Sequence, residues 1–177
     1  MLISKIPVLD KGYVGLIDSS NTTKKLRDIG QEFFGGDYPS SIEELGTLTL
    51  VLKCPIFIQL TLSKYNFKII GTKPSPELEA FIPKSHEIGT KDRQLNDLIS
   101  DDIDRTTQAL MINPKAYRAD GADSDISQIL TPINIYTTLI VHGSYNEWCK
   151  FAYKNSSKLI ESYSRAIQQI IEAEWKP

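Results

Sequence analysis

Cysteine and histidine are scarce in this sequence, with two residues of each type among 177. Cys54 and Cys149 stand outside any C-x-x-C spacing, and His86 and His142 have no metal-ligand partner close to them in the sequence. These absences argue against a structural metal site and against a disulfide framework. We therefore expect two free thiols, buried as small apolar groups, in a protein of the cytoplasm.

Long apolar runs and an excess of charge are also missing. No run is long enough to cross a bilayer, and Asp10 and Lys11 interrupt the apolar start before it reaches the length of a signal peptide. The formal net charge is −2, so the chain lacks the basic field that non-specific nucleic-acid binding requires. We expect neither a membrane nor a nucleic acid as partner. The length and the 41% of hydrophobic residues predict one globular domain over residues 1–177.

Hydrophobic periodicity predicts strands and helices that do not alternate regularly. Strands are expected at 2–8, at 13–18, at 47–53 with a continuation over 56–62, and at 133–142. Helices are expected between the cap at 19–21 and Phe34, from Lys91 to just before Pro114, through 126–130, after the capping box of Ser144 and Glu147, and through 159–171. Residues 37–46, 71–90 and 116–125 are expected to be loops. No glycine-rich phosphate loop follows a strand, so the fold class is α+β, with a mainly antiparallel sheet and flanking helices.

Three stretches resemble segments of the flavin-dependent thymidylate synthases. VLDKGYVGLID at 8–18 is similar to the family's opening strand-turn-strand, and KCPIFI at 53–58 is similar to its K-small-P-apolar-F strand. ISQILTPINIYTTLIV at 126–141 resembles its helix-to-strand corner, which carries L-P and Y-T. The three matches come in the family's order and span most of the chain. The resemblance implies a thymidylate synthase-complementing-protein-like fold.

The same resemblance implies an activity, a cofactor and an assembly. Members of the family are tetramers that hold FAD between subunits and transfer a one-carbon unit from methylenetetrahydrofolate to C5 of dUMP. Their RHRxxSxNExSxR signature begins where this chain has Lys64-Tyr65-Asn66. Lysine keeps one positive charge there but loses the planar fork that suits bidentate phosphate contacts.

Carried over residue by residue, the resemblance implies a cofactor site and a nucleotide site. The positions that would contact the cofactor are Ser41, Lys64, Tyr65, Asn66, Ser144 and Lys150. The positions that would contact the nucleotide are Gln128, Lys154 and Asn155. Most family arginines are replaced at these positions, although each charged contact of this kind contributes about 1.5–3 kcal/mol. No catalytic residue is assigned.

Two functions are compatible with this pattern. The first is a divergent flavin-dependent enzyme of pyrimidine nucleotide metabolism with altered nucleotide specificity, in which lysines replace the arginines and the flavin carries the chemistry. The alternative is a catalytically inactive subunit, which pairs with a catalytic paralogue or binds a nucleotide without turnover. Both imply a homo-oligomer or a hetero-oligomer. Residues 64–66 also suit an ordinary polar chain turn, and His142 suits a hydrogen-bonded structural role.

Overall fold

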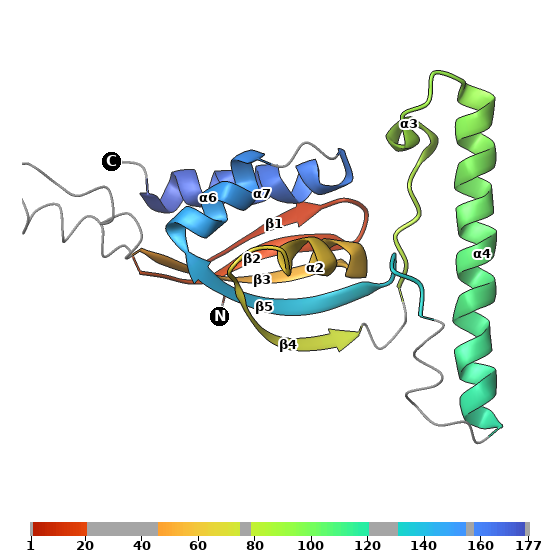
Figure 1. The fold of residues 1–177 in the computed structure, drawn as a ribbon, viewed down its shortest axis with the longest axis horizontal. Coiled ribbons are helices and arrows are strands. Elements are labelled where there is room, and N and C mark those ends of the chain that lie inside the picture. Colours follow the sequence, from red (N-terminus) through yellow and green to blue (C-terminus); the bar gives the residue numbers. More distant parts are fainter. Residues whose placement is uncertain (1, 21–45, 75–78, 121–130, 155–157, 176–177) are drawn as a thin grey trace, which may run out of the picture.

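Five antiparallel strands form the sheet of this protein, and helices cover one of its faces (Figure 1). The computed structural model describes residues 2–20, 46–74, 79–120, 131–154 and 158–175. The strands are β1 (Ser4–Val8), β2 (Gly12–Ser20), β3 (Thr47–Pro55), β4 (Lys68–Pro74) and β5 (Tyr136–Ser144). The helices are α2 (Ile56–Leu62), α3 (Ser85–Ile88), α4 (Arg93–Ala119), α6 (Tyr145–Lys154) and α7 (Lys158–Trp175). The expected α+β class with an antiparallel sheet is confirmed.

The sheet has the order β1-β2-β3-β5-β4, so β5 lies between two strands that precede it in the sequence. The predicted N-terminal hairpin is confirmed, with Val8 paired to Gly12. Gly12 is needed there because an added Cβ would lie 2.8 Å from two backbone oxygens and closer still to the Tyr163 hydroxyl. The predicted strands at 47–53 and 133–142 correspond to β3 and β5, which pair along their whole lengths.

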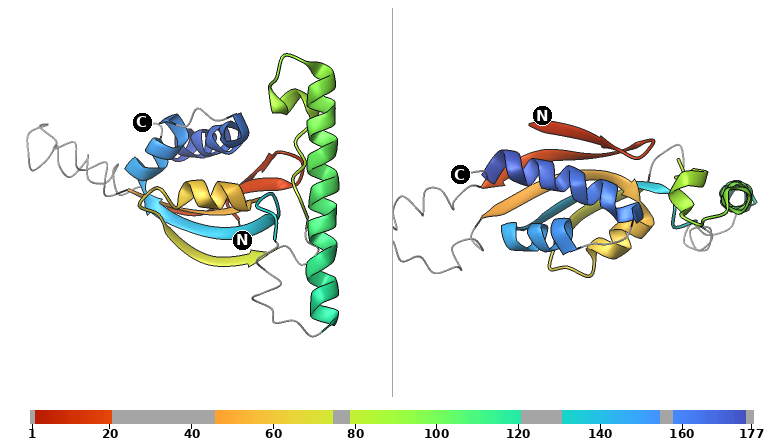
Figure 2. Two further views of the ribbon diagram at one scale, coloured as in Figure 1. Left: turned by 45° about the vertical axis from the view of Figure 1, so that its right-hand side comes forward. Right: turned by 90° about the horizontal axis from the view of Figure 1, so that it is seen from above.

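The hydrophobic core lies between the sheet and helices α2, α6 and α7 (Figure 2). In α7 the buried positions follow helical spacing, as expected for an amphipathic helix that packs on a sheet. They are Tyr163, Ala166, Ile167, Ile170 and Ile171. Trp148 and Phe151 of α6 are fully buried against leucines of β3 and β5, and the indole N–H of Trp148 donates to the carbonyl of Leu48.

Helix α4 stands beyond the end of the sheet, away from the three covering helices (Figures 1 and 2). Two hydrogen bonds connect it to the extended segments beside it. The Asn134 amide donates to Thr107 Oγ1 at 2.9 Å, and the Ser100 hydroxyl donates to the carbonyl of Pro83 at 2.7 Å. Leu95, Leu98 and Ile112 of this helix are exposed to solvent.

Three predicted boundaries are wrong. Residues 56–62 form helix α2 instead of prolonging the strand, because Pro55 has no N–H for the ladder and occupies the N-cap position of α2. Ile58 and Leu62 are buried at helical spacing, whereas Leu60, which a strand would bury with them, is 53% exposed.

The other two corrections concern the segment after residue 67. Residues 68–74 form β4, although residues 71–74 were expected to belong to a loop. The strand has a bulge at Gly71, whose φ is +73°. Helix α4 does not end before Pro114 but continues to Ala119. The helix continues although proline has no N–H to donate to the carbonyl four residues earlier.

Several predictions concern residues that the structure does not describe. The helix before Phe34, most of the loop at 37–46 and the helix at 126–130 lie outside the described residues. In the described part of the chain, no helix combines the length and the apolar character needed to cross a membrane.

Candidate functional site

Five of the nine residues implied by the family resemblance come together in the structure. The turn after α2 carries Lys64, Tyr65 and Asn66, and it lies against the first turns of α6, which follow Ser144 and include Lys150. The link is a hydrogen bond from the N–H of Asn66 to the Glu147 carboxylate at 3.1 Å. We call this region the α2–α6 corner. Ser41, Gln128 and Asn155 lie outside the described residues.

The backbone of the turn is fully occupied. The N–H groups of Ser63, Lys64 and Tyr65 donate to carbonyls of the last turn of α2, and the N–H of Phe67 donates to the carbonyl of Tyr65. The N–H of Asn66 is taken by Glu147. An anion-binding loop requires several unpaired N–H groups that point to one place. This turn has none to offer a phosphate.

Tyr65 belongs to an aromatic cluster inside the protein. Its ring lies 5.7 Å from that of Phe67 and 5.5 Å from that of Phe151, measured between centroids. The ring of Phe67 lies 4.3 Å from that of Trp148. Gly143 permits this packing, because an added Cβ would lie 2.4 Å from a Phe67 ring carbon. The half-buried phenol ring therefore packs the turn against α6.

Ser144 and Glu147 have roles within the chain. The Ser144 hydroxyl accepts a hydrogen bond from the N–H of Glu147 at 3.3 Å, so it caps α6 as predicted. The Glu147 carboxylate does not complete the capping box. It binds the ammonium of Lys150, one turn further along the helix, and the N–H of Asn66.

This arrangement determines the charge of the corner. The hydrogen bond from Lys150 holds the pKa of the Glu147 carboxyl below its usual value, against partial burial, and the Asn66 N–H lowers that pKa further. Lys150 is thus neutralised by a carboxylate of its own helix. Lys64 and Lys154 are exposed and have no ionic partner among the described residues. Lys154 lies one turn beyond Lys150 on the same face of α6.

A second polar cluster lies at the opposite end of the sheet strands and was not predicted. The buried Tyr136 phenol donates to the Asp10 carboxylate at 2.5 Å, and the Lys53 ammonium lies 5.7 Å from the centroid of the same ring. Lys53 also pairs with Glu79, and its carbonyl accepts a hydrogen bond from the Tyr163 hydroxyl at 2.8 Å. Burial and the Asp10 carboxylate raise the pKa of Tyr136, which keeps the phenol protonated.

This cluster joins the three family-like stretches. Asp10 comes from VLDKGYVGLID, Lys53 from KCPIFI, and Tyr136 from the Y-T of the third stretch. Nothing in the spacing of the sequence indicated that these residues touch. Only the resemblance, which singled out the three stretches together, could have suggested it.

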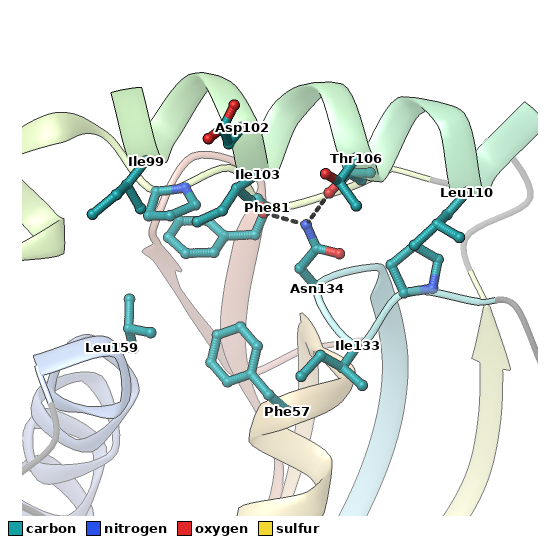
Figure 3. Close-up of a pocket in the computed structure, with 13 residues that line it drawn as sticks. Phe57, Phe81, Ile99, Asp102, Ile103, Thr106, Leu110, Ile133, Asn134 and Leu159 are labelled. Atoms are coloured by element: carbon teal, nitrogen blue, oxygen red, sulfur yellow. Dashed lines mark hydrogen bonds between the residues drawn. The ribbon is translucent and has the colours of Figure 1, made fainter. Parts of the chain in front are cut away.

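The structure also contains a cavity between α4 and the body of the protein (Figure 3). Its volume is about 590 Å³, and its walls are mainly apolar, with the rings of Phe57 and Phe81 6.2 Å apart. The Asn134 amide reaches into it and donates to the carbonyl of Phe81 at 3.0 Å (Figure 3). The volume falls in the range of small-molecule sites. None of the residues predicted for a site lines this cavity.

The described corner does not fit a flavin held by one chain alone. The pyrophosphate of FAD needs cations or free N–H groups. Here the N–H groups of the turn are occupied and Lys150 is paired, which leaves Lys64 and Lys154 as the described lysines of the corner that could contact it. No group of three or more histidine, cysteine or acidic side chains in the described ranges is placed to hold a metal ion. His142 shares a hydrogen bond with the Thr49 hydroxyl at 2.9 Å, as expected for a structural histidine. Cys54 and Cys149 form no disulfide in the described part of the chain; the first is buried and the second half-buried.

Neither a scan against protein-family models nor a search of curated proteins finds a match for this chain. The resemblance to the flavin-dependent thymidylate synthases therefore depends on the three short stretches, their order and the residues that they contribute to one cluster.

Proposed function

We propose that this chain is a divergent relative of the flavin-dependent thymidylate synthases that acts as a non-catalytic subunit in pyrimidine nucleotide metabolism. The observation that carries the proposal is the contact between Asp10, Lys53 and Tyr136. Each residue comes from a different family-like stretch, and together they fix the hairpin, the end of β3 and the start of β5.

The α2–α6 corner supports the non-catalytic form of the proposal. Where the family signature begins, this chain has a turn whose N–H groups are all used. Lys150, at another position for which the resemblance implies a cofactor contact, is paired with Glu147. Such a corner stabilises the junction of the turn with α6 and gives little energy to a bound phosphate. The subunit would work in a homo-oligomer or beside a catalytic paralogue that supplies the missing charges.

The second candidate is a flavin enzyme with altered nucleotide specificity. Lys64 and Lys154 favour it, because both are exposed cations without an ionic partner among the described residues. In that case FAD and a pyrimidine nucleotide would bind where several chains meet, and binding would weaken steeply with salt.

Flavin content separates the two candidates. The full chain is purified, and released flavin is measured per chain before and after incubation with FAD. We expect none under either condition. Stoichiometric flavin would favour the enzyme and count against the non-catalytic subunit.

Titration with dUMP at low and at high salt then tests the link to pyrimidine nucleotides. We expect weak binding that is lost at high salt and reduced in Lys64→Ala. Lys91→Ala removes the same charge from an exposed position away from the corner and should bind like the unmodified chain. Absence of both flavin and dUMP binding, also after addition of a catalytic family member, would overturn the proposed function.

A further inference from the structure

Helix α4 carries apolar side chains on two sides of its axis. On one side Ile99, Ile103 and Leu110 line the cavity that faces the body of the protein (Figure 3). On the other side Leu95, Leu98 and Ile112 are 45%, 58% and 65% exposed. An amphipathic helix that packs on one side only is expected to be polar on the other. The exposed apolar side chains therefore need a separate explanation.

The exposed positions form a regular pattern, which we call the outer stripe. It consists of Leu95, Leu98, Asp102, Arg105, Ala109 and Ile112, all of them exposed. Successive members are separated alternately by three and four residues, which is the spacing of the contact positions in a pair of packed helices. Figures 1 and 2 show no described element on the side of α4 that faces away from the sheet.

The charges of the stripe indicate which partner fits it. Asp102 and Arg105 lie at its centre, both largely exposed, and their own ion pair is long at 3.4 Å. If a second α4 lies antiparallel with its Arg105 opposite Asp102, the reciprocal pair forms by symmetry. The same register sets Leu98 opposite Ala109 and Leu95 opposite Ile112. In a parallel pair, Asp102 would lie opposite Asp102 and Arg105 opposite Arg105 of the second copy, so that like charges would face each other.

The charge of the whole helix favours the same direction. Residues 93–106 contain four aspartates and two arginines, whereas residues 107–119 contain Lys115 and Arg118 and no acidic residue. An antiparallel pair therefore brings the acidic half of each helix to the basic half of the other. Complementary charge of this kind sets register and orientation in helix pairs.

We propose that a second copy of this chain docks on the outer stripe, with the two α4 helices antiparallel and Asp102 of each copy paired with Arg105 of the other. This interface is one form that the homo-oligomer of the proposed function can take, and it involves none of the residues of the α2–α6 corner. Asp102 of the stripe also lies at the edge of the cavity, so the second copy would border the cavity. A contact of six positions per helix is small, and interfaces below about 1,200 Å² are typical of weak association. We expect a dissociation constant in the micromolar range.

Sedimentation velocity of the full chain, without ligand, over a concentration series across the micromolar range measures the dimer. Leu98→Glu places a carboxylate in the stripe and should leave a monomer at every concentration. Leu60→Glu is the matched control, because Leu60 is 53% exposed but lies on α2. It should dimerise like the unmodified chain. Circular dichroism of both variants verifies that they are folded.

Charge exchange tests the register. Asp102→Arg and Arg105→Asp should each weaken the dimer by at least about tenfold, because like charges then face each other. Mixing the two single variants should restore a dimer, since one chain contributes two arginines and the other two aspartates. The double exchange in one chain should restore it as well.

Four results would overturn the proposal. They are a monomer throughout the series, a dimer that survives Leu98→Glu, a dimer abolished by Ile70→Glu on the uncovered face of the sheet, and a charge exchange that fails to restore association. Because no flavin or nucleotide is present, each of these results leaves the test of the proposed function untouched.

Discussion

Replacing Gly143 by alanine should destabilise the protein through a single steric conflict. The new Cβ would lie 2.4 and 2.7 Å from two ring carbons of Phe67 and 3.4 Å from the indole nitrogen of Trp148. The Phe67 ring has little room to retreat, because its centroid is 4.3 Å from that of Trp148. Overpacking of this kind costs about 2 kcal/mol, within a range of about 1–3. In a chain of this size that loss lowers Tm by about 4–8 °C.

A double-mutant cycle with Phe67→Ala tests whether the conflict is the cause. Phe67→Ala removes the ring, so Gly143→Ala in that background should cost less than about 0.5 kcal/mol, and the coupling energy should exceed about 1 kcal/mol. Urea denaturation of the four proteins measures the free energies of unfolding. If the losses of unfolding free energy in the two single variants simply add, the alanine does not act through the Phe67 ring. The packing of the turn at 63–67 on α6, as described above, is then wrong.

Three further predictions concern the corner and the core. Ser144→Ala removes the cap of α6 and should lower the free energy of unfolding by about 1 kcal/mol in the same urea assay, whereas Ser144→Thr should lose less. Because its folded-state pKa is lowered, the Glu147 carboxyl stabilises the protein above the usual glutamate pKa, and this contribution is lost as the pH falls through the lowered value. The Glu147→Gln variant should therefore be less stable than the unmodified chain near neutral pH and should lose less stability on acidification. Thermal melts of both proteins at a series of pH values will measure this difference. Burial raises the pKa of the Cys54 thiol, so at mildly alkaline pH a thiol reagent should modify Cys54 only after denaturant is added, and rapid labelling in the native state would contradict its burial.

Elements with one clear periodicity and clear ends could be predicted from the sequence. The hairpin turn at 10–12, the alternation of threonine and leucine in β3 and the capped start of α6 each specify one local structure. The apolar face of α7 specifies how that helix packs. In these cases local preference and tertiary packing agree, so the pattern is sufficient.

Helix α2 could not be predicted, because its sequence satisfies two periods at once. Ile56, Ile58, Leu60 and Leu62 alternate as in a strand, yet positions 58 and 62 also match a helical turn. The choice is made by what the chain packs against. As a helix, α2 buries Ile58 and Leu62 in the core and leaves Leu60 at the surface, and Pro55 ends the ladder just before it. Short apolar runs of this kind remain ambiguous without the tertiary structure.

The α2–α6 corner demonstrates why residue type alone cannot identify a binding site. The family resemblance assigns Asn66 and Lys150 to a ligand by their positions. In the structure a carboxylate of the chain itself, Glu147, accepts from the Lys150 ammonium and from the backbone N–H of Asn66, which lies 81 residues earlier in the sequence. A donor is available to a ligand only where no acceptor of the chain can reach it. That condition depends on which distant segments are neighbours, and no local pattern reports it. Lys64 and Lys154, which no described carboxylate reaches, are therefore the lysines on which a nucleotide would have to depend.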